Sequence, residues 1–206
     1  MHSTSAGAPS AVPGPEWVVA EMPPGFQNRV AEIQRLMSDL HEMGQFGSLL
    51  YQVGPELGEA VRRVFEAMKF EADILTGPVS SAVAVRLDAH RRLLLIPSAA
   101  TDAIQKKGPE LAQVFQLLHE VAEEETDRVA LITNADPGTR PADRAAAITP
   151  EALAFLVRMG ASHLQASTLF ALWKLSLNDA ARARAQVERL YGQAAGTFEL
   201  SLSQTR

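Results

Sequence analysis

The side chains in this sequence that could do chemistry are few and scattered. The chain has five histidines and no cysteine, so neither a thiolate metal site nor a cysteine nucleophile is possible. His119 stands directly beside Glu120 rather than one helical turn from it, so the two do not form a metal-binding pair on one helix face. Ser80, Ser81 and Ser98 lack the Gly-x-Ser-x-Gly context of a hydrolase nucleophile, and there is no glycine-rich phosphate loop.

The other candidate ligands stand alone. His41, His90 and His163 are far apart in the chain, and we expect each of them at the surface or in a loop rather than on a metal ion. Asp73 and Asp88 flank a predicted hairpin and could lie close together, which would make them the place for a relocated catalytic site. Two carboxylates without a third ligand or a lysine bind a metal ion poorly. We therefore expect no metal ion and no cofactor.

The composition is that of a globular protein. The chain has 206 residues, of which 47% are hydrophobic and 21% charged, with a net charge of −5; this suits one domain with an appendage. The acidic balance argues against a protein whose main activity is non-specific binding to nucleic acid, although a local basic patch could still form. There is no apolar run of about 18 residues and no secretory signal pattern. With the absence of cysteine, this leads us to expect a cytoplasmic protein without a membrane segment.

Two segments precede the predicted domain. Residues 1–25 are rich in Ser, Ala, Gly and Pro and are predicted to form a flexible tail, in which the apolar residues around Trp17 either lie against the domain or dock a partner. Residues 26–44 are predicted to form an amphipathic helix. Its apolar residues are spaced by four, three, four and three positions, as at an a/d seam: Phe26, Val30, Ile33, Met37 and Leu40. This seam of about two heptads either packs on the chain's own domain or forms a homodimer interface.

The elements of residues 45–206 centre on a buried strand at 91–96, which contains four consecutive apolar residues. Strands are also predicted at 70–75 and 82–87. The tight turn at 88–90 joins the strands at 82–87 and 91–96 as an antiparallel hairpin. Helices are predicted over residues 55–69 and 109–125.

A strand at 128–133 follows the second of these helices and so should run parallel to a neighbour. Thr149 and Pro150 mark the start of a helix that ends near Gly160. A strand at 163–166 precedes a helix capped by Ser167 or Thr168. A last helix at 178–191 and an edge strand at 197–200 complete an α/β domain whose mixed central sheet is flanked by helices.

Local phrases between residues 49 and 175 occur in an order that resembles the PD-(D/E)XK nuclease superfamily, the restriction-endonuclease-like fold, and in particular its bacterial Mrr-like members. The phrases are Leu49-Leu50-Tyr51, Leu57-Gly58-Glu59-Ala60-Val61, Lys69-Phe70-Glu71-Ala72, the strand from Arg92 to Pro97, Leu131-Ile132-Thr133-Asn134, Arg140-Pro141 with Arg144, Ile148-Thr149-Pro150-Glu151-Ala152-Leu153, and Ser167-Thr168-Leu169-Phe170-Ala171-Leu172.

In that superfamily an Asp at the second strand and an acid on the third strand hold Mg²⁺, and a Lys two residues after the acid stabilises developing charge. In this sequence the acid position falls on Leu95 and the Lys position on Pro97. The Asp position falls near Ser80, Ser81 or Ala82. The resemblance therefore implies a degenerate member that does not cleave nucleic acid, and we expect no enzymatic activity.

The resemblance also bears on charged residues outside the motif. Glu59 matches a helical acid of some relatives, and without its partners we expect it to be a surface or capping residue. Lys106 and Lys107 match a loop that lies near the phosphate backbone in active relatives, and Arg140, Arg144 and Arg158 could add positive charge at the sheet edge. The candidate nucleic-acid-binding residues are Lys106, Lys107, Arg140 and Arg144. We expect a protein-interaction or scaffold module that forms a homodimer through its N-terminal helix. The alternative is a nucleic-acid-binding protein without cleavage activity.

Overall fold

The computed structural model describes residues 18, 21–77, 79, 81–123 and 125–201. Most of the predicted tail, including Trp17, lies outside these residues, and so does Ser80. The chain forms two compact units, Met1–Gly44 and Gln45–Arg206.

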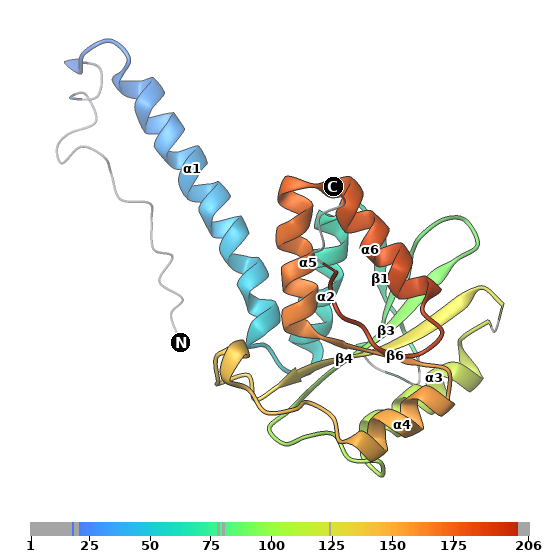
Figure 1. The fold of residues 1–206 in the computed structure, drawn as a ribbon. Coiled ribbons are helices and arrows are strands. Elements are labelled where there is room, and N and C mark those ends of the chain that lie inside the picture. Colours follow the sequence, from blue (N-terminus) through green and yellow to red (C-terminus); the bar gives the residue numbers. More distant parts are fainter. Residues whose placement is uncertain (1–17, 19–20, 78, 80, 124, 202–206) are drawn as a thin grey trace. The chain divides into compact units, whose positions relative to one another are not determined.

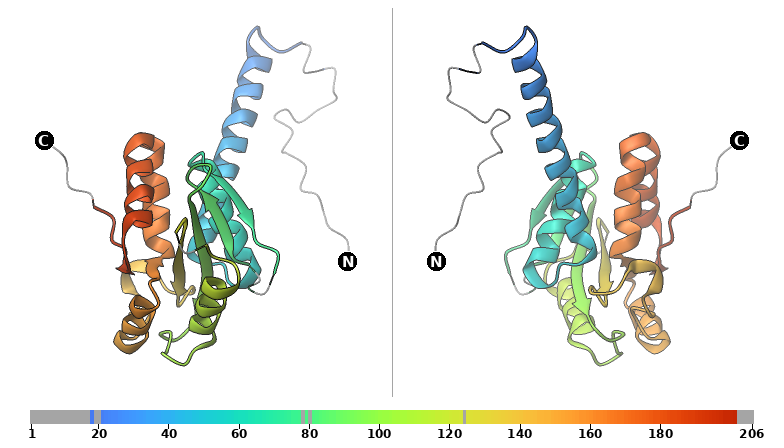
Figure 2. Two further views of the ribbon diagram at one scale, coloured as in Figure 1. Left: turned by 90° about the vertical axis from the view of Figure 1, so that its right-hand side faces the viewer. Right: turned by 90° about the vertical axis from the view of Figure 1, so that its left-hand side faces the viewer.

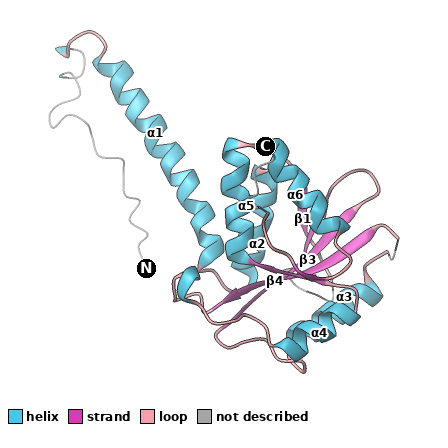
Figure 3. Cartoon of the chain, viewed as in Figure 1, coloured by secondary structure: helices cyan, strands magenta, loops and turns pink. Residues whose placement is uncertain are grey.

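The first unit contains most of one long helix, α1, which runs from Phe26 to Phe46 and is uninterrupted (Figure 3). It continues two residues past the expected end at Gly44. No residue of α1 is buried.

The second unit is built on a six-stranded sheet whose strands are neighbours in chain order. Its strands are β1 (Glu71–Ile74), β2 (Val83–Arg86), β3 (Arg92–Ala100), β4 (Asp127–Ala135), β5 (Ser162–Gln165) and β6 (Gly196–Thr197). Its helices are α2 (Gly54–Ala67), α3 (Pro109–Glu120), α4 (Pro150–Arg158), α5 (Ala166–Asn178) and α6 (Ala180–Gly192), with 3-10 turns η2 (Gly47–Leu50) and η3 (Pro141–Asp143). β1, β2 and β3 pair antiparallel, whereas β3 to β6 pair parallel. The predicted α/β architecture, the hairpin and the parallel strand are confirmed.

Helices cover both faces of this sheet. α2, α5 and α6 lie on one face and α3 and α4 on the other (Figures 1 and 2). Side chains alternate along each strand, so β3 sends Leu93 and Leu95 into the core beneath α2 and α5, and Leu94 and Ile96 into the core beneath α3 and α4. With both faces covered, the central strands read as continuous apolar runs.

β3 is longer than the sequence predicted. It continues past Ile96 to Ala100 because its second half pairs with β4, up to Ala100 opposite Ala135. β2 pairs with β3 only as far as Leu95. Beyond that point β3 has one neighbour, and Pro97, which has no N–H, is tolerated there as it would be on an edge strand.

The edge strand predicted at 197–200 is shifted and shorter, since β6 covers only Gly196–Thr197. Several helix boundaries also differ from the predicted ones. Thr149 caps α4 as predicted, since its Oγ1 accepts a hydrogen bond of 3.3 Å from the Ala152 N–H. The predicted cap of α5 was wrong: the helix starts at Ala166 after Gln165, and neither Ser167 nor Thr168 caps it. The strand β5 passes directly into α5, whose first residue, Ala166, is fully buried.

The helix α3 also ends earlier than predicted, at Glu120 rather than near 125. The chain turns after it, and the Asp127 carboxylate accepts a hydrogen bond of 2.8 Å from the Glu123 N–H. Within the described ranges, every helix is too short or too polar to cross a membrane.

Candidate functional site

The position where the resemblance places the metal-binding acid is part of the hydrophobic core. Leu95 is fully buried, and it lies opposite Val83 of β2 and Ala130 of β4. Pro97 is half-buried and lies opposite Ile132. None of these side chains offers an oxygen ligand or a charge to a metal ion or a phosphate. Among the residues that the structure describes, no group of three or more His, Cys, Asp or Glu could hold a metal ion.

The start of β2, where the resemblance places the Asp, lies directly against α2. A Cβ atom added to Gly58 of α2 would stand only 2.8 Å from the Ser81 carbonyl oxygen. Ser81 has a φ of 73°, and the next residue, Ala82, is fully buried. At Gly58 the helix and the start of β2 are therefore in backbone contact, and a larger residue at Gly58 would push them apart.

Glu59 is held by two arginines of its own helix. Arg62 donates from Nε to Oε2 over 2.8 Å and from Nη2 to Oε1 over 2.6 Å, and Arg63 donates from Nε to Oε1 over 2.9 Å. The hydrogen bonds from Arg62 are the largest cause of a pKa of about 2 for Glu59. The carboxylate is thus ionised at neutral pH, and it forms ion pairs with arginines of its own helix, α2.

Asp73 and Asp88 are not brought together. Asp73 lies opposite Ala84 on the β1–β2 ladder, and Asp88 follows Ala84 by four residues, a displacement of about 13 Å along the strand. Asp88 instead accepts hydrogen bonds of 2.9 Å from the N–H groups of His90 and Arg91. The bond from the His90 N–H, followed by that from the Arg91 side chain, whose Nε donates to Oδ2 over 2.6 Å, lowers the pKa of Asp88 to about 2. Asp88 therefore organises the hairpin turn.

His163 was expected at the surface or in a loop, and that expectation was wrong. The side chain is 2% exposed on β5. Its Nε2 lies 2.9 Å from Thr133 Oγ1 and its Nδ1 lies 3.2 Å from Thr197 Oγ1. Burial lowers the pKa of His163 to about 4, so the ring is neutral at pH 7 and joins β4, β5 and β6. Ser162, His163 and Leu164 of β5 are all buried, because helices cover both faces of the sheet.

Arg144, one of the predicted phosphate contacts, is turned into the protein. Its guanidinium donates to the Thr139 carbonyl over 2.8 Å, to Asn134 Oδ1 over 2.7 Å and to the Leu50 carbonyl over 2.6 Å. Burial lowers the pKa of Arg144 from its usual value. Asn134 is fully buried and in turn donates to the Gln52 carbonyl over 2.9 Å. This geometry favours an internal clamp between η2 and the end of β4 over a phosphate contact.

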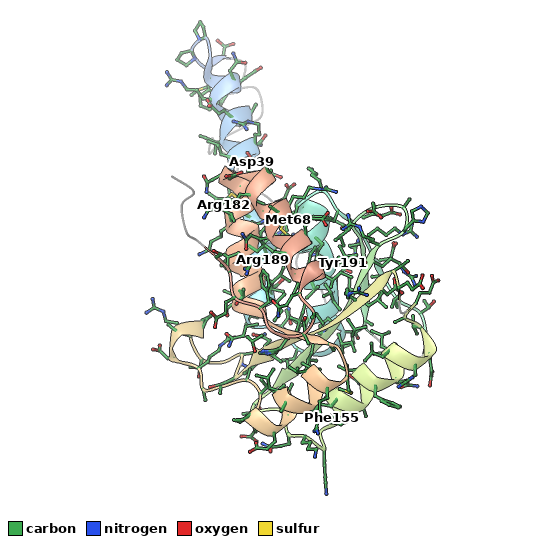
Figure 4. All side chains as sticks on the ribbon, turned by 45° about the vertical axis from the view of Figure 1, so that its right-hand side comes forward. Asp39, Met68, Phe155, Arg182, Arg189 and Tyr191 are labelled. Atoms are coloured by element: carbon green, nitrogen blue, oxygen red, sulfur yellow. The ribbon has the colours of Figure 1, made fainter. Side chains whose placement is uncertain are left out.

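Lys106, Lys107 and Arg140 are exposed. The Nζ of Lys106 lies 5.9 Å from the ring centroid of Phe155 on α4, and the guanidinium of Arg158 lies 5.6 Å from the same ring. Figure 4 shows Phe155 on the opposite side of the sheet from Tyr191 and Arg189 of α6. Lys106 and Arg158 thus lie close to the same ring. The spacing of residues in the sequence could not reveal this, because 52 residues separate them.

A pocket of about 740 Å³ lies beside this group, between α3 and α4. Its lining includes Phe115, His119, Arg128 and Arg158. Phe115 is 54% exposed, and its ring centroid stands 4.1 Å from that of His119. Exposed aromatic rings beside cationic side chains are the groups on which nucleic acid bases and phosphates bind.

The helix α1 carries a stripe of exposed apolar side chains, and we call it the α1 stripe. It consists of the five predicted residues together with Leu36 and Met43. Phe26 and Val30 are half-buried, and the other five are exposed by 48% to 71%: Ile33, Leu36, Met37, Leu40 and Met43. Exposed apolar patches are more frequent at interaction sites than on the remaining surface of a protein.

Comparison of the chain with models of protein families, with curated proteins and with solved structures found no match.

Proposed function

We propose that this chain is a non-cleaving member of the restriction-endonuclease-like superfamily that acts in the cytoplasm as a protein-interaction module and forms a homodimer through α1. The order of helices and strands from α2 to α5 supports the relationship, since it is the order that the resemblance implied. The buried Leu95 supports the absence of cleavage, because an apolar core residue stands where a metal ligand would be needed.

The observation that carries the proposal is the α1 stripe. Seven apolar side chains recur at helical spacing along α1, and five of them are large and exposed. Exposed apolar surface gains about 25 cal/mol for every Å² that a partner removes from water. The opposite face of α1 is polar and carries the Arg35–Asp39 ion pair, at 3.2 Å. Such an amphipathic helix is stabilised when a second helix covers its stripe.

Light scattering on the full chain tests the homodimer. We expect a mass of two chains at micromolar concentration. The double variant Ile33→Glu with Leu40→Glu should be monomeric because it places charge in the stripe. The matched control, Ala31→Glu with Ser38→Glu, adds the same two charges to the polar side of α1 and should remain dimeric. A monomeric wild-type chain would refute the homodimer, and dimers from both double variants would exclude the α1 stripe as its interface.

A second function is nucleic-acid binding without cleavage, favoured by two cationic side chains, Lys106 and Arg158, that lie within 6 Å of the Phe155 ring centroid, at 5.9 Å and 5.6 Å. In that case labelled single- or double-stranded DNA should bind more weakly as the salt concentration rises. Lysine and arginine side chains that contact phosphates release counterions, and this release is less favourable at high salt. The variant Lys106→Glu with Lys107→Glu should lose binding, whereas Lys174→Glu, on α5 at the other face of the sheet, should keep it. Absence of any shift at low salt, with Mg²⁺ present, would refute this function.

A further inference from the structure

The α1 stripe is wider than the seam of a two-stranded parallel coiled coil. If the seven positions of each heptad are lettered a to g, Val30, Met37 and Gly44 occupy position a, and Phe26, Ile33 and Leu40 occupy position d. Arg29, Leu36 and Met43 occupy position g, and the last two of these belong to the α1 stripe. Apolar residues at a, d and g together form a face of about three residues in seven, which needs more cover than a strict a/d seam receives.

The orientation of the partner helix decides what covers the g positions. In a parallel pair, each g residue faces position e of the partner, so Leu36 would lie beside the partner's His41, an ionisable side chain. In an antiparallel pair, g faces g and e faces e. Leu36 then lies beside its own copy near the twofold axis. The antiparallel orientation thus places apolar against apolar at the centre of the helix.

The ends of the seam show the same preference. In the antiparallel pair, position a of one helix meets position d of the other, so the register that joins Val30 to Leu40 also joins Met37 to Ile33 and Phe26 to Gly44. The largest side chain of the seam then faces the residue that has none. A Cβ atom added to Gly44 would meet nothing within 4 Å, so the space beside it is open to the Phe26 ring. In a parallel pair two Phe26 rings would face each other at one end and two glycines would leave a gap at the other, which costs packing energy at both ends.

We propose that the partner covering the α1 stripe is a second copy of this chain in antiparallel orientation, with the pairs Val30–Leu40, Ile33–Met37 and Phe26–Gly44 in register. This inference rests on the homodimer proposed above and adds its geometry. In this register the two Gln45 residues lie at opposite ends of the helix pair, about 30 Å apart along its axis. The dimer therefore presents two α/β domains from opposite ends, as a bivalent scaffold requires.

Disulfide trapping tests the orientation, because the chain has no cysteine and each introduced thiol is then unique. The variants are Val30→Cys and Leu40→Cys, one of them carrying a mass tag. Each alone should give almost no cross-linked dimer under mild oxidation, and their mixture should give the cross-linked product of intermediate mass, since a disulfide needs Cα atoms within about 7 Å. Ile33→Cys with Met37→Cys is a second pair for the same register, in case either first variant misfolds.

The outcomes separate the orientation from the dimer. Light scattering on each variant first establishes the dimer, and circular dichroism establishes that α1 is intact. Cross-linking of Val30→Cys alone would show a parallel pair and overturn the orientation while the homodimer stands. A dimer without cross-links in either mixture would overturn the register. A monomer of the wild-type chain would overturn the homodimer itself, and the α1 stripe would then be left for a helix of another protein.

Discussion

Replacement of Leu95 by Glu should destabilise the protein severely. This substitution restores the residue type that an active nuclease would need at that position. It therefore distinguishes a solvent-filled cleft at this position from an apolar core. If the position were still a cleft, a carboxylate would be tolerated there. In the structure Leu95 is fully buried, between Val83 and Ala130, and the carboxylate would enter an apolar core.

The expected size follows from two contributions. Loss of the apolar burial of a leucine side chain costs about 1.5–3 kcal/mol. An unpaired carboxyl group in an apolar environment costs several kcal/mol more, and it reduces this cost by staying protonated. Since domains of this kind are stable by about 5–15 kcal/mol, Leu95→Glu should remove at least half of the free energy of unfolding.

Urea unfolding followed by circular dichroism measures the effect. Leu95→Met, which nearly preserves the volume, should cost less than about 1.5 kcal/mol. The penalty of Leu95→Glu should grow as the pH rises above about 4.3, the pKa of Glu in an unfolded chain, because the buried carboxyl group would have a raised pKa and resist ionisation. A Glu variant as stable as the Met variant at pH 7 would refute the assignment of Leu95 to the core and point to a solvated site.

Two further predictions concern buried polar groups. Between pH 6.5 and pH 4 the unfolded chain binds a proton at His163 that the folded chain does not, since burial lowers the folded pKa to about 4; the free energy of unfolding should therefore fall as the pH falls, by up to about 3 kcal/mol from this residue. His163→Gln should show a flatter decline in urea unfolding over this pH range, and an unchanged decline would contradict a buried neutral ring. Arg144→Ala should cost about 2–3 kcal/mol because it leaves the buried Asn134 Oδ1 without its donor, and Arg144→Lys should recover only part of this, since an ammonium group cannot reproduce the guanidinium fork. An Arg144→Lys variant with the same thermal unfolding temperature as the wild-type chain would rule out the clamp of Arg144 on three acceptors.

Much of the fold could be predicted because its signals are local. Four apolar residues in succession indicated the buried β3, and the short polar turn at Asp88 indicated the hairpin with β2. Thr149 followed by Pro150 gave the start of α4, since an N-cap bond is made within three residues. The a/d spacing in α1 is likewise a property of consecutive residues.

The predictions that were wrong concern residues whose structure depends on a segment distant in the sequence. β3 runs past Pro97 to Ala100 because β4 pairs with it there, and His163 is buried because helices cover both faces of β5. Arg144 forms its clamp with acceptors 5, 10 and 94 residues away, and no spacing rule connects these positions.

The same division holds for function. The sequence by itself determined that neither an acid nor a lysine occurs from Leu93 to Ser98, and that α1 has one apolar face, because both are facts of residue type and short-range order. Only the tertiary structure decided that Leu95 points into the core beneath α2 and α5, and that Lys106 and Arg158 both lie close to the Phe155 ring. The physical reason is that burial and electrostatic contact depend on which segments the fold packs together, and long-range packing of this kind is not encoded in any one stretch of the chain.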